Sequence, residues 1–299
     1  MKSPVLSILF LLISVTLLAV PNDFRFRHFS VEDGLSSNSV RAIMQDKYGF
    51  LWIGTEEGLN RYDGIMIKSY SICPQAAGKY ISSLYGTKKN IWIGTDEGIY
   101  IYAYATETFT YFDLTTPNNV RITSIVNHIL QDKDGNLWFS TNGQGLFRYN
   151  LSKNYLEQYE FTSAFGIVAS TMADSDNQIW ALTNQGESGV YKLNKAENKF
   201  EPFGLLYNAG NHHSQALAML EDSEQTLWLG TWECGLQKID KYTRQTTTYL
   251  HPTDGKGVTH IHSLMEYAPH QLLIGSDDGL LLFNTLTEEY KLFNEKETV

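Results

Sequence analysis

The side chains best suited to hold a ligand lie in loops of the second half of the chain. Trp232 stands beside Glu233 in the segment TWECGL, and His212 and His213 lie near the end of the long connection FGLLYNAGNHHS, residues 203–214. A flat indole can stack on a sugar ring while carboxylate and imidazole groups bond its hydroxyls. The sequence therefore predicts a ligand site here, the alternative being that Trp232 packs on a neighbouring loop. Loop position alone adds six candidate companions: Arg121, Asn142, Gln144, Gln185, Glu187 and His260.

Metal binding and catalysis find less support in the sequence. The candidate metal ligands would be His212, His213, His260 and His262. Adjacent histidines rarely chelate one ion, and no cysteine or carboxylate spacing accompanies them. The motifs G-x-S-x-G and H-E-x-x-H and a phosphate-binding glycine loop do not occur. Asp277 and Asp278 are expected to form a solvated hairpin turn rather than a catalytic pair. We therefore expect no metal, no cofactor and no enzymatic activity.

A sequence repeat determines where these loops lie. Five copies carry Trp in the segments LWIGT, IWIGT, LWFST, IWALT and LWLGT, and a sixth, LLIGS, has Leu273 in its place. These positions are 40, 46, 42, 48 and 45 residues apart, and all six segments are followed by Gly and an aliphatic residue. A period of this size indicates propeller blades or helical arrays. Four copies also carry Asp six positions before the Trp: Asp46, Asp132, Asp174 and Asp222.

Each copy is predicted to form four short strands. Runs of apolar, aromatic and β-branched residues are cut by Gly, Asp and Asn, as antiparallel meanders require, and no helical period persists. The predicted fold is therefore an all-β propeller of four-stranded antiparallel blades. Its Trp residues fill the space between sheets, and its Asp residues form turns. The six blades are expected at about residues 36–70, 80–113, 122–160, 165–202, 214–250 and 259–294.

The loops of three blades are enlarged. From the Trp position to the Gly, copies one, two and six use 6 residues, whereas copies three, four and five use 7, 9 and 7. These turns and the connection at residues 203–214 should open on one face of the propeller. Because binding residues concentrate on loops held by a rigid scaffold, that face near blades three to five is the predicted ligand site.

The N-terminal residues are expected to be a secretory signal peptide. Lys2 precedes an apolar run from Val5 to Val20, which is short for a membrane span of about 20 residues. Residues 1–22 would then be removed, with an uncleaved anchor as the alternative, and residues 23–299 would form a periplasmic domain. The chain has a net charge of −10, and loss of Lys2 makes it −11. Such a surface repels phosphate backbones, so nucleic acid is not an expected partner.

The count of strands suggests an incomplete ring. The segment FRFRHF at residues 24–29 looks like a lone outer strand that precedes six complete copies. If it closes a further blade, the other three strands of that blade should lie beyond Val299. We therefore expect a seven-bladed ring cut short, with a self-contained six-bladed ring as the alternative. A truncated ring would expose one face of blade six.

The repeat resembles a known family. The segment HFSVEDGLSSNSVRAIMQDKYGFLWIGTEEGLNRYDG, residues 28–64, is similar to the first blade of two-component regulator propeller repeats. Such repeats form the periplasmic sensor region of hybrid two-component systems of Bacteroides-type bacteria. Copy four departs from the pattern by losing the glycine of W-x-G-T, and copy six by losing its Trp.

The resemblance implies a sensor for polysaccharide-derived oligosaccharides that controls carbohydrate-utilisation genes. Full-length members carry a membrane helix, a histidine kinase and a DNA-binding module, none of which is expected in these residues. It also implies a homodimer formed through this region. Two alternatives remain: an assembly module without its own ligand, and a propeller enzyme resembling streptogramin lyases, which have similar D-x-x-G-x-x-W blades.

Overall fold

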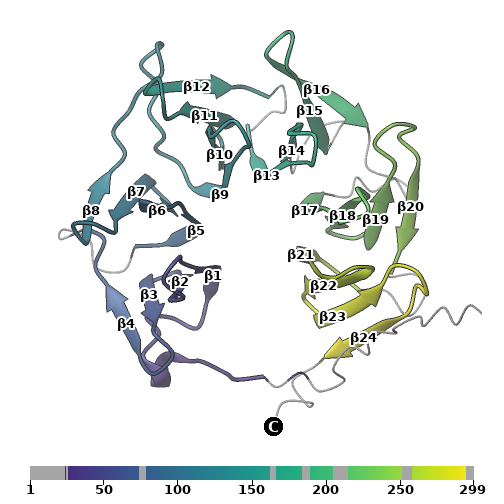
Figure 1. The fold of residues 1–299 in the computed structure, drawn as a ribbon, viewed down its shortest axis with the longest axis horizontal. Helices are drawn as coiled ribbons and strands as arrows, with labels where there is room; N and C mark the ends of the chain where they lie inside the picture. The colour runs from purple at the N-terminus through teal and green to yellow at the C-terminus, as the bar shows by residue number, and fades with distance from the viewer. Residues whose placement is uncertain are drawn as a thin grey trace, which may run out of the picture.

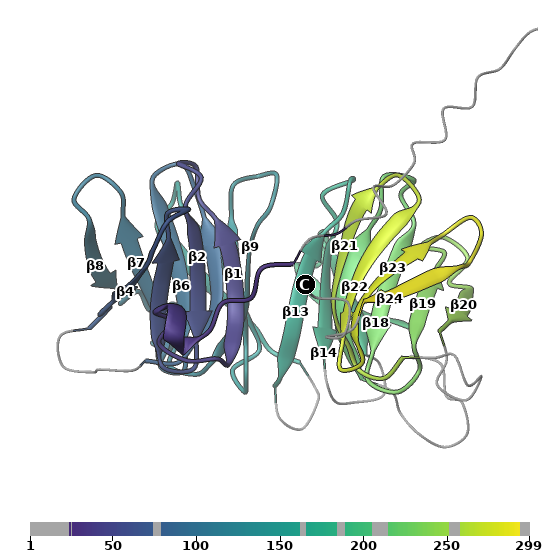
Figure 2. The same ribbon diagram turned by 90° about the horizontal axis from the view of Figure 1, so that it is seen from below.

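The computed structural model describes Phe24 and residues 26–73, 79–161, 166–183, 189–204, 215–250 and 258–293. The expected signal peptide lies outside these residues. They form six four-stranded antiparallel sheets, and in each sheet the strands are neighbours in chain order. Figure 1 shows the sheets arranged as blades around a central axis, and Figure 2 shows them from the side. The all-β propeller and its six four-stranded blades are thus confirmed. None of the helices in these residues is long and apolar enough to cross a membrane.

The strands follow one pattern from blade to blade. Blade one holds β1 (Val40–Gln45), β2 (Leu51–Thr55), β3 (Gly58–Tyr62) and β4 (Ile67–Tyr70), and blade two holds β5 (Ile81–Gly86), β6 (Asn90–Thr95), β7 (Gly98–Ala103) and β8 (Thr108–Tyr111). Blade three holds β9 (Val126–Gln131), β10 (Leu137–Thr141), β11 (Leu146–Asn150) and β12 (Tyr155–Tyr159), and blade four holds β13 (Val168–Ala173), β14 (Ile179–Thr183), β15 (Val190–Asn194) and β16 (Lys199–Gly204). Blade five holds β17 (Ala216–Glu221), β18 (Leu227–Thr231), β19 (Leu236–Ile239) and β20 (Thr246–Tyr249), and blade six holds β21 (Ile261–Ala268), β22 (Gln271–Ser276), β23 (Gly279–Asn284) and β24 (Tyr290–Phe293).

The repeated Asp closes the first hairpin of its blade and also anchors the Trp. In blade one, Asp46 Oδ1 accepts hydrogen bonds from the amides of Tyr48 and Phe50 at 2.9 and 3.0 Å, which fixes the turn. Its Oδ2 accepts a hydrogen bond from Trp52 Nε1 at 2.7 Å. The same indole contact recurs in blades three, four and five at 2.8, 3.0 and 2.6 Å. The sequence predicted the turn but not this second contact.

The core lies between blades rather than within one sheet. Each repeat Trp packs on the next blade, so that Trp52 shares a buried cluster with Ile81, Ile91 and Ile93 of blade two. Gly54 allows this approach, because a Cβ at that position would come within 2.5 Å of Ile81 Cγ2. Blade four has Leu182 instead of glycine, and the facing residue of blade five is the small Ala216. The lost glycine in copy four is therefore matched by a smaller partner.

The six blades form an open series. The innermost strands β1, β5, β9, β13, β17 and β21 each contact the next one in that order, and no comparable contact joins β21 to β1 in the described residues. Figure 1 shows the opening between blades six and one. The expected outer strand at residues 24–29 is not a strand where the structure describes it. Among the described residues no strand pairs with its backbone, and a strand needs such a partner.

Candidate functional site

Two loops meet on one face of the propeller at blades five and six, while residues 184–188 and 205–214 of the face predicted near blades three to five lie outside the described residues. We call this the loop face: it carries the connections into the innermost strands and the turns between second and third strands. Trp232, in the turn between β18 and β19, donates its amide to the Gln215 carbonyl at 2.9 Å. The His260 amide in turn donates to the Trp232 carbonyl at 3.0 Å. The turn of blade five is thus tied to the segments that lead into blades five and six.

Trp232 and His260 stack on each other at this junction. Their ring centroids are 3.8 Å apart and the planes differ by 28°. Trp232 nevertheless stays 39% exposed, unlike the five repeat tryptophans, all of which are buried. His260 has a positive φ of 47°, a backbone conformation uncommon for residues other than glycine. Stacking and the backbone hydrogen bond hold it there, so one face of the indole is backed by imidazole.

An acidic residue completes the group. Asp277, in the turn between β22 and β23, contacts Nδ1 of His260 through Oδ2 and Nε2 of His262 through Oδ1, the latter at 2.7 Å. The hydrogen bond with His260, followed by that with His262, lowers the pKa of Asp277 below its ordinary value. Asp278 accepts the Thr259 amide and hydroxyl at 2.7 and 3.0 Å. The expected hairpin turn is present, but its carboxylates hold the neighbouring loop rather than facing only water.

We call Trp232, His260, His262 and Asp277 the Trp–His cluster. Sequence reasoning identified Trp232 and His260 but named His262 only as a metal ligand and assigned Asp277 to a simple turn. One signal was available: His260 and His262 alternate with Ile261, so both side chains leave the chain on the same side. Nothing local in the sequence reveals that a turn 15 residues later reaches both. Glu233 is exposed in the same turn as Trp232.

Three other candidates form a separate group at blade three. The Gln144 side chain accepts the amides of Thr123 and Ser124 at 2.9 and 3.0 Å, and it donates to the Arg121 carbonyl at 3.0 Å. Arg121 pairs with Asp113 at 2.8 Å. Asn142 is bridged to Ile167. Gln144 therefore fixes the connection into blade three, and no described contact links this group to Trp232.

The remaining candidates cannot be placed. Four of them lie outside the described residues: Gln185, Glu187, His212 and His213. Of the four histidines considered as metal ligands, the structure therefore describes only His260 and His262. Among the residues that are described, no three or more His, Cys, Asp and Glu side chains are grouped so as to hold a metal ion.

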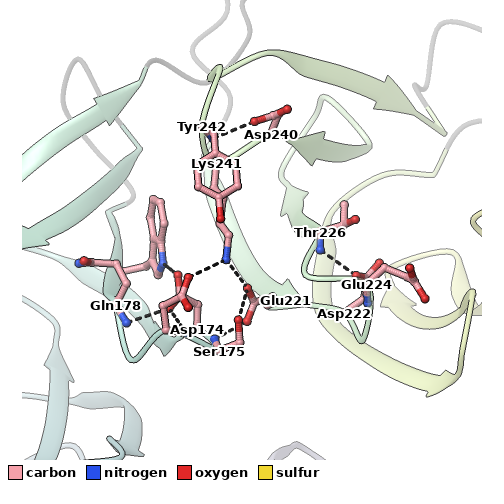
Figure 3. Close-up of polar contacts among 12 residues, drawn as sticks. Asp174, Ser175, Gln178, Glu221, Asp222, Glu224, Thr226, Asp240, Lys241 and Tyr242 are labelled. Atoms are coloured by element: carbon pink, nitrogen blue, oxygen red, sulfur yellow. Dashed lines mark hydrogen bonds and ion pairs between the residues drawn. The ribbon is translucent and has the colours of Figure 1, made fainter.

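A second polar cluster lies on the opposite face and joins blades four and five (Figure 3). Lys241 Nζ contacts Glu221 Oε1 at 2.8 Å and Asp176 Oδ2 at 3.4 Å, while Glu221 also accepts the amide and hydroxyl of Ser175. Loss of water lowers the pKa of Lys241, but the hydrogen bond and charge of Glu221, with help from Asp176, outweigh this and raise it. These charges satisfy one another, which is what a structural contact between blades requires.

Comparison with known proteins finds the repeat predicted from the motifs in two segments of the chain. Residues 34–57 and 120–143 match the family model described as two component regulator propeller. A protein named histidine kinase P4, from Formosa agariphila, is 26% identical over 293 residues, and the match covers 92% of this chain and 21% of that protein. The chain thus spans about a fifth of the length of this relative.

Solved structures show the same fold. The extracellular domain of a putative hybrid two component system from B. thetaiotaomicron superposes with a TM-score of 0.75 at 22% identity, covering 91% of this chain and 37% of that chain. Virginiamycin B lyase from Staphylococcus aureus superposes with a TM-score of 0.67 at 15% identity, covering 87% of this chain and 86% of that chain. At these identities the likeness establishes the propeller fold and nothing about activity.

Proposed function

We propose that this chain, whose blades carry two component regulator propeller repeats, is the extracytoplasmic ligand-sensing propeller of a two-component signalling protein. Its ligand would be a polysaccharide-derived oligosaccharide, and binding would control carbohydrate-utilisation genes. The observation that carries this proposal is the exposed Trp232 stacked on His260 at the loop face. The similarity to a histidine kinase and to an extracellular sensor domain supports the signalling context.

The chemistry of the Trp–His cluster suits a sugar. His260 covers one side of the indole, which leaves its exposed surface as an apolar platform for the C–H face of a pyranose ring. His262, whose side chain is 48% exposed, and Asp277 offer hydrogen-bonding atoms beside it. Pockets that combine a flat apolar surface with a few fixed polar groups give orientation as well as affinity. Glu233, in the same turn, adds an acceptor.

Signalling would follow from a difference in affinity between two arrangements of the sensor. We infer that the chain acts as a homodimer, and a ligand that binds one arrangement of the dimer better shifts the population toward it. Export to the periplasm places the loop face where oligosaccharides are found. The proposal gives this chain no catalytic step. A divalent ion found by metal analysis of the purified protein would favour the lyase-like alternative.

A glycan array with the purified residues 23–299 tests ligand binding. We expect binding to a defined set of oligosaccharides and a loss of about tenfold or more in affinity for Trp232→Ala, corresponding to about 1.4 kcal/mol or more. Tyr242→Ala is the matched control, because Tyr242 is an exposed aromatic residue in the turn between β19 and β20, at the other end of β19 from the turn that holds Trp232. A chain that binds no oligosaccharide while circular dichroism shows an intact fold would refute direct sensing by this propeller.

A further inference from the structure

Asp277 determines which nitrogen of each histidine in the Trp–His cluster carries a hydrogen. The hydrogen bonds with His260 and His262 lower the pKa of Asp277, so at neutral pH it is an ionised carboxylate that can only accept hydrogen bonds. Its Oδ2 contacts Nδ1 of His260, and its Oδ1 contacts Nε2 of His262. Both nitrogens must therefore donate. A neutral imidazole has a single N–H, so Nε2 of His260 and Nδ1 of His262 carry no hydrogen and are acceptors.

These two acceptor nitrogens belong to rings that contact the exposed indole of Trp232. The His260 ring is stacked on the indole, and the His262 ring stands edge-on to it, with centroids 6.4 Å apart and planes at 85°. Neither acceptor has a hydrogen-bond partner in the described part of the chain, and Nε2 of His260 is not buried. Within the cluster, the indole N–H of Trp232 is the only side-chain donor that remains for a ligand. The other free hydrogen-bonding positions are acceptors.

Negative charge surrounds the Trp–His cluster on the loop face. The described acidic residues in the turns between second and third strands are Glu56, Glu57, Asp96, Glu97, Glu233, Asp277 and Asp278. Arg41, Lys79 and Arg121 lie on the same face, but each already contacts a carboxylate. Asp277 is paired with imidazoles rather than with a lysine or an arginine. The surroundings of the indole therefore disfavour an anionic ligand.

We propose that the Trp–His cluster selects uncharged oligosaccharides and excludes those whose bound ring carries a carboxylate or sulfate group. This inference rests on the proposed function and adds the charge class of the ligand. Hydroxyl groups of the sugar donate to Nε2 of His260 and Nδ1 of His262, while the C–H face of its ring lies on Trp232. A carboxylate or sulfate in the same place has no hydrogen to donate, and it would bring negative charge toward Asp277 and Glu233.

Nitrogen NMR of the ligand-free chain tests the arrangement of hydrogens directly. At pH 7.5 we expect His260 to be the tautomer with hydrogen on Nδ1 and His262 to be the tautomer with hydrogen on Nε2. The signals are assigned by their loss in single variants, such as His262→Gln. If either histidine is the opposite tautomer, or carries hydrogen on both nitrogens at this pH, the proposal fails whatever the chain binds.

Paired oligosaccharides test the selection. Each neutral hexose probe is compared with its uronic acid counterpart, in which a carboxylate replaces the C6 hydroxymethyl group, and with a sulfated form. We expect the neutral probe to bind about tenfold or more tighter, and the difference to narrow in 1 M salt, where the Debye length is about 3 Å. Equal or tighter binding of the acidic probes would overturn this inference and leave oligosaccharide sensing intact. Binding of neither class would refute the proposed function and this inference together.

Two substitutions assign the selection to named groups. His262→Gln keeps an N–H for Asp277 but removes the Nδ1 acceptor, so affinity for the neutral probes should fall by about fivefold or more. Glu233→Gln removes one negative charge beside the indole and should reduce the discrimination against acidic probes. His270→Gln, in the turn after β21 at the other end of that strand, is the matched control and should change neither affinity. Neutral probes that bind His262→Gln as tightly as wild type would contradict the proposal.

Discussion

The repeated aspartate has two structural functions, because its carboxylate both fixes a hairpin turn and anchors the tryptophan of its blade. In blades one, three, four and five the carboxylate caps the hairpin amides with one oxygen and receives the indole N–H with the other. Blade two has no such aspartate, and Trp92 Nε1 is buried without a hydrogen-bond partner in the described residues. Blades one and two therefore allow a direct comparison: the buried indole N–H of Trp52 has a hydrogen-bond partner, and that of Trp92 has none in the described residues.

Replacing these tryptophans should reveal the value of that hydrogen bond. We expect Trp52→Phe to lower the free energy of unfolding by about 1–2 kcal/mol more than Trp92→Phe, because only the first leaves a buried carboxylate oxygen unpaired. Both substitutions remove similar apolar volume, so each serves as the other's control. Urea denaturation of the two variants gives the difference. Equal costs would show that the indole hydrogen bond contributes nothing net.

His128, in β9, makes stability depend on pH. Its Nδ1 is buried without a partner, and burial lowers its pKa to about 4, against a weaker opposing effect of the Thr171 backbone. The unfolded chain, with a histidine pKa of about 6.5, takes up this proton first. Stability from this residue is therefore complete above about pH 6.5 and falls as the pH drops toward 4.

Replacing the imidazole of His128 should remove this dependence of stability on pH. We expect wild type to lose at most about 2 kcal/mol between pH 7 and pH 5 through this residue, and His128→Gln to lose correspondingly less. Urea midpoints at the two pH values measure the difference. A variant whose midpoint falls as much as that of wild type would assign the loss to other groups.

For single residues, the sequence predicted which residues belong to the candidate site better than it predicted which residues contact each other. Trp232 was recognisable because it stands outside the repeat position, and His260 because of its loop. Asp277 was not recognisable in this way. It lies in the turn between β22 and β23, but its contacts are with His260 and His262 at the start of blade six. Gln144 was predicted as a ligand residue from its loop position. Its hydrogen bonds to backbone groups show a structural role that loop position alone does not reveal.

At the scale of strands, neighbouring blades fit together because the side chains on the second strand of one blade and the innermost strand of the next are matched in size. Where a blade has glycine in its second strand, the next innermost strand presents Ile or Val, as with Gly54 and Ile81. Where blade four has Leu182, blade five presents Ala216. The two sequence positions are 34 residues apart. Packed interiors tolerate such exchanges when total volume is kept.

A double-mutant cycle tests this matching. Leu182→Gly alone leaves a cavity and should cost about 2–5 kcal/mol, while Ala216→Ile alone overpacks the interface and should cost about 1–3 kcal/mol. The double variant recreates the glycine–isoleucine pairing that follows blades one and five and should cost clearly less than the sum. Chemical denaturation provides all three values. Strict additivity would mean that the two residues do not compensate each other.

The strands themselves were the most predictable part of the structure. Short β-rich runs between turn residues gave the four strands of each blade, because hairpins are local in sequence. The segment at residues 24–29 has the same composition but does not form a strand in the described part of the chain. Strand formation requires hydrogen bonds to a neighbour, and composition carries no information about whether that neighbour is present.

Over the whole molecule, the blades form a series in which each contacts only the next. Blades two to five are covered on both faces, whereas blades one and six each have one exposed face, as Val40 and Met265 show. In arrays built from neighbour contacts, stability is close to a sum of unit and interface contributions. The end blades therefore have one interface fewer than the others.

Amide exchange should follow this order. We expect protection in β9, β10, β13 and β14 to exceed that in β1, β2, β21 and β22 by about tenfold or more, because opening an end blade breaks a single interface. Peptide-resolved exchange by mass spectrometry measures it directly. Uniform protection around the ring would show that the six blades unfold as one cooperative unit despite the opening.

The number of blades came directly from the repeat, but their closure did not. The repeat period fixes how many units exist and what each face looks like, since every face is a copy of the next. Whether two particular faces meet depends on the number of units around the axis. The count of strands only suggested an opening, and the exposed Val40 and the partly buried Leu273 show in three dimensions which faces border it.

The contact between Phe24 and Phe293 brings the first and last described residues into one aromatic cluster. A short linker could therefore join them, and the chain could be cut instead between blades three and four. Such a circular permutant keeps every contact between neighbouring blades, because none of them depends on the order in which the blades are connected. In this architecture the polypeptide can therefore begin at a different blade without losing a contact between blades.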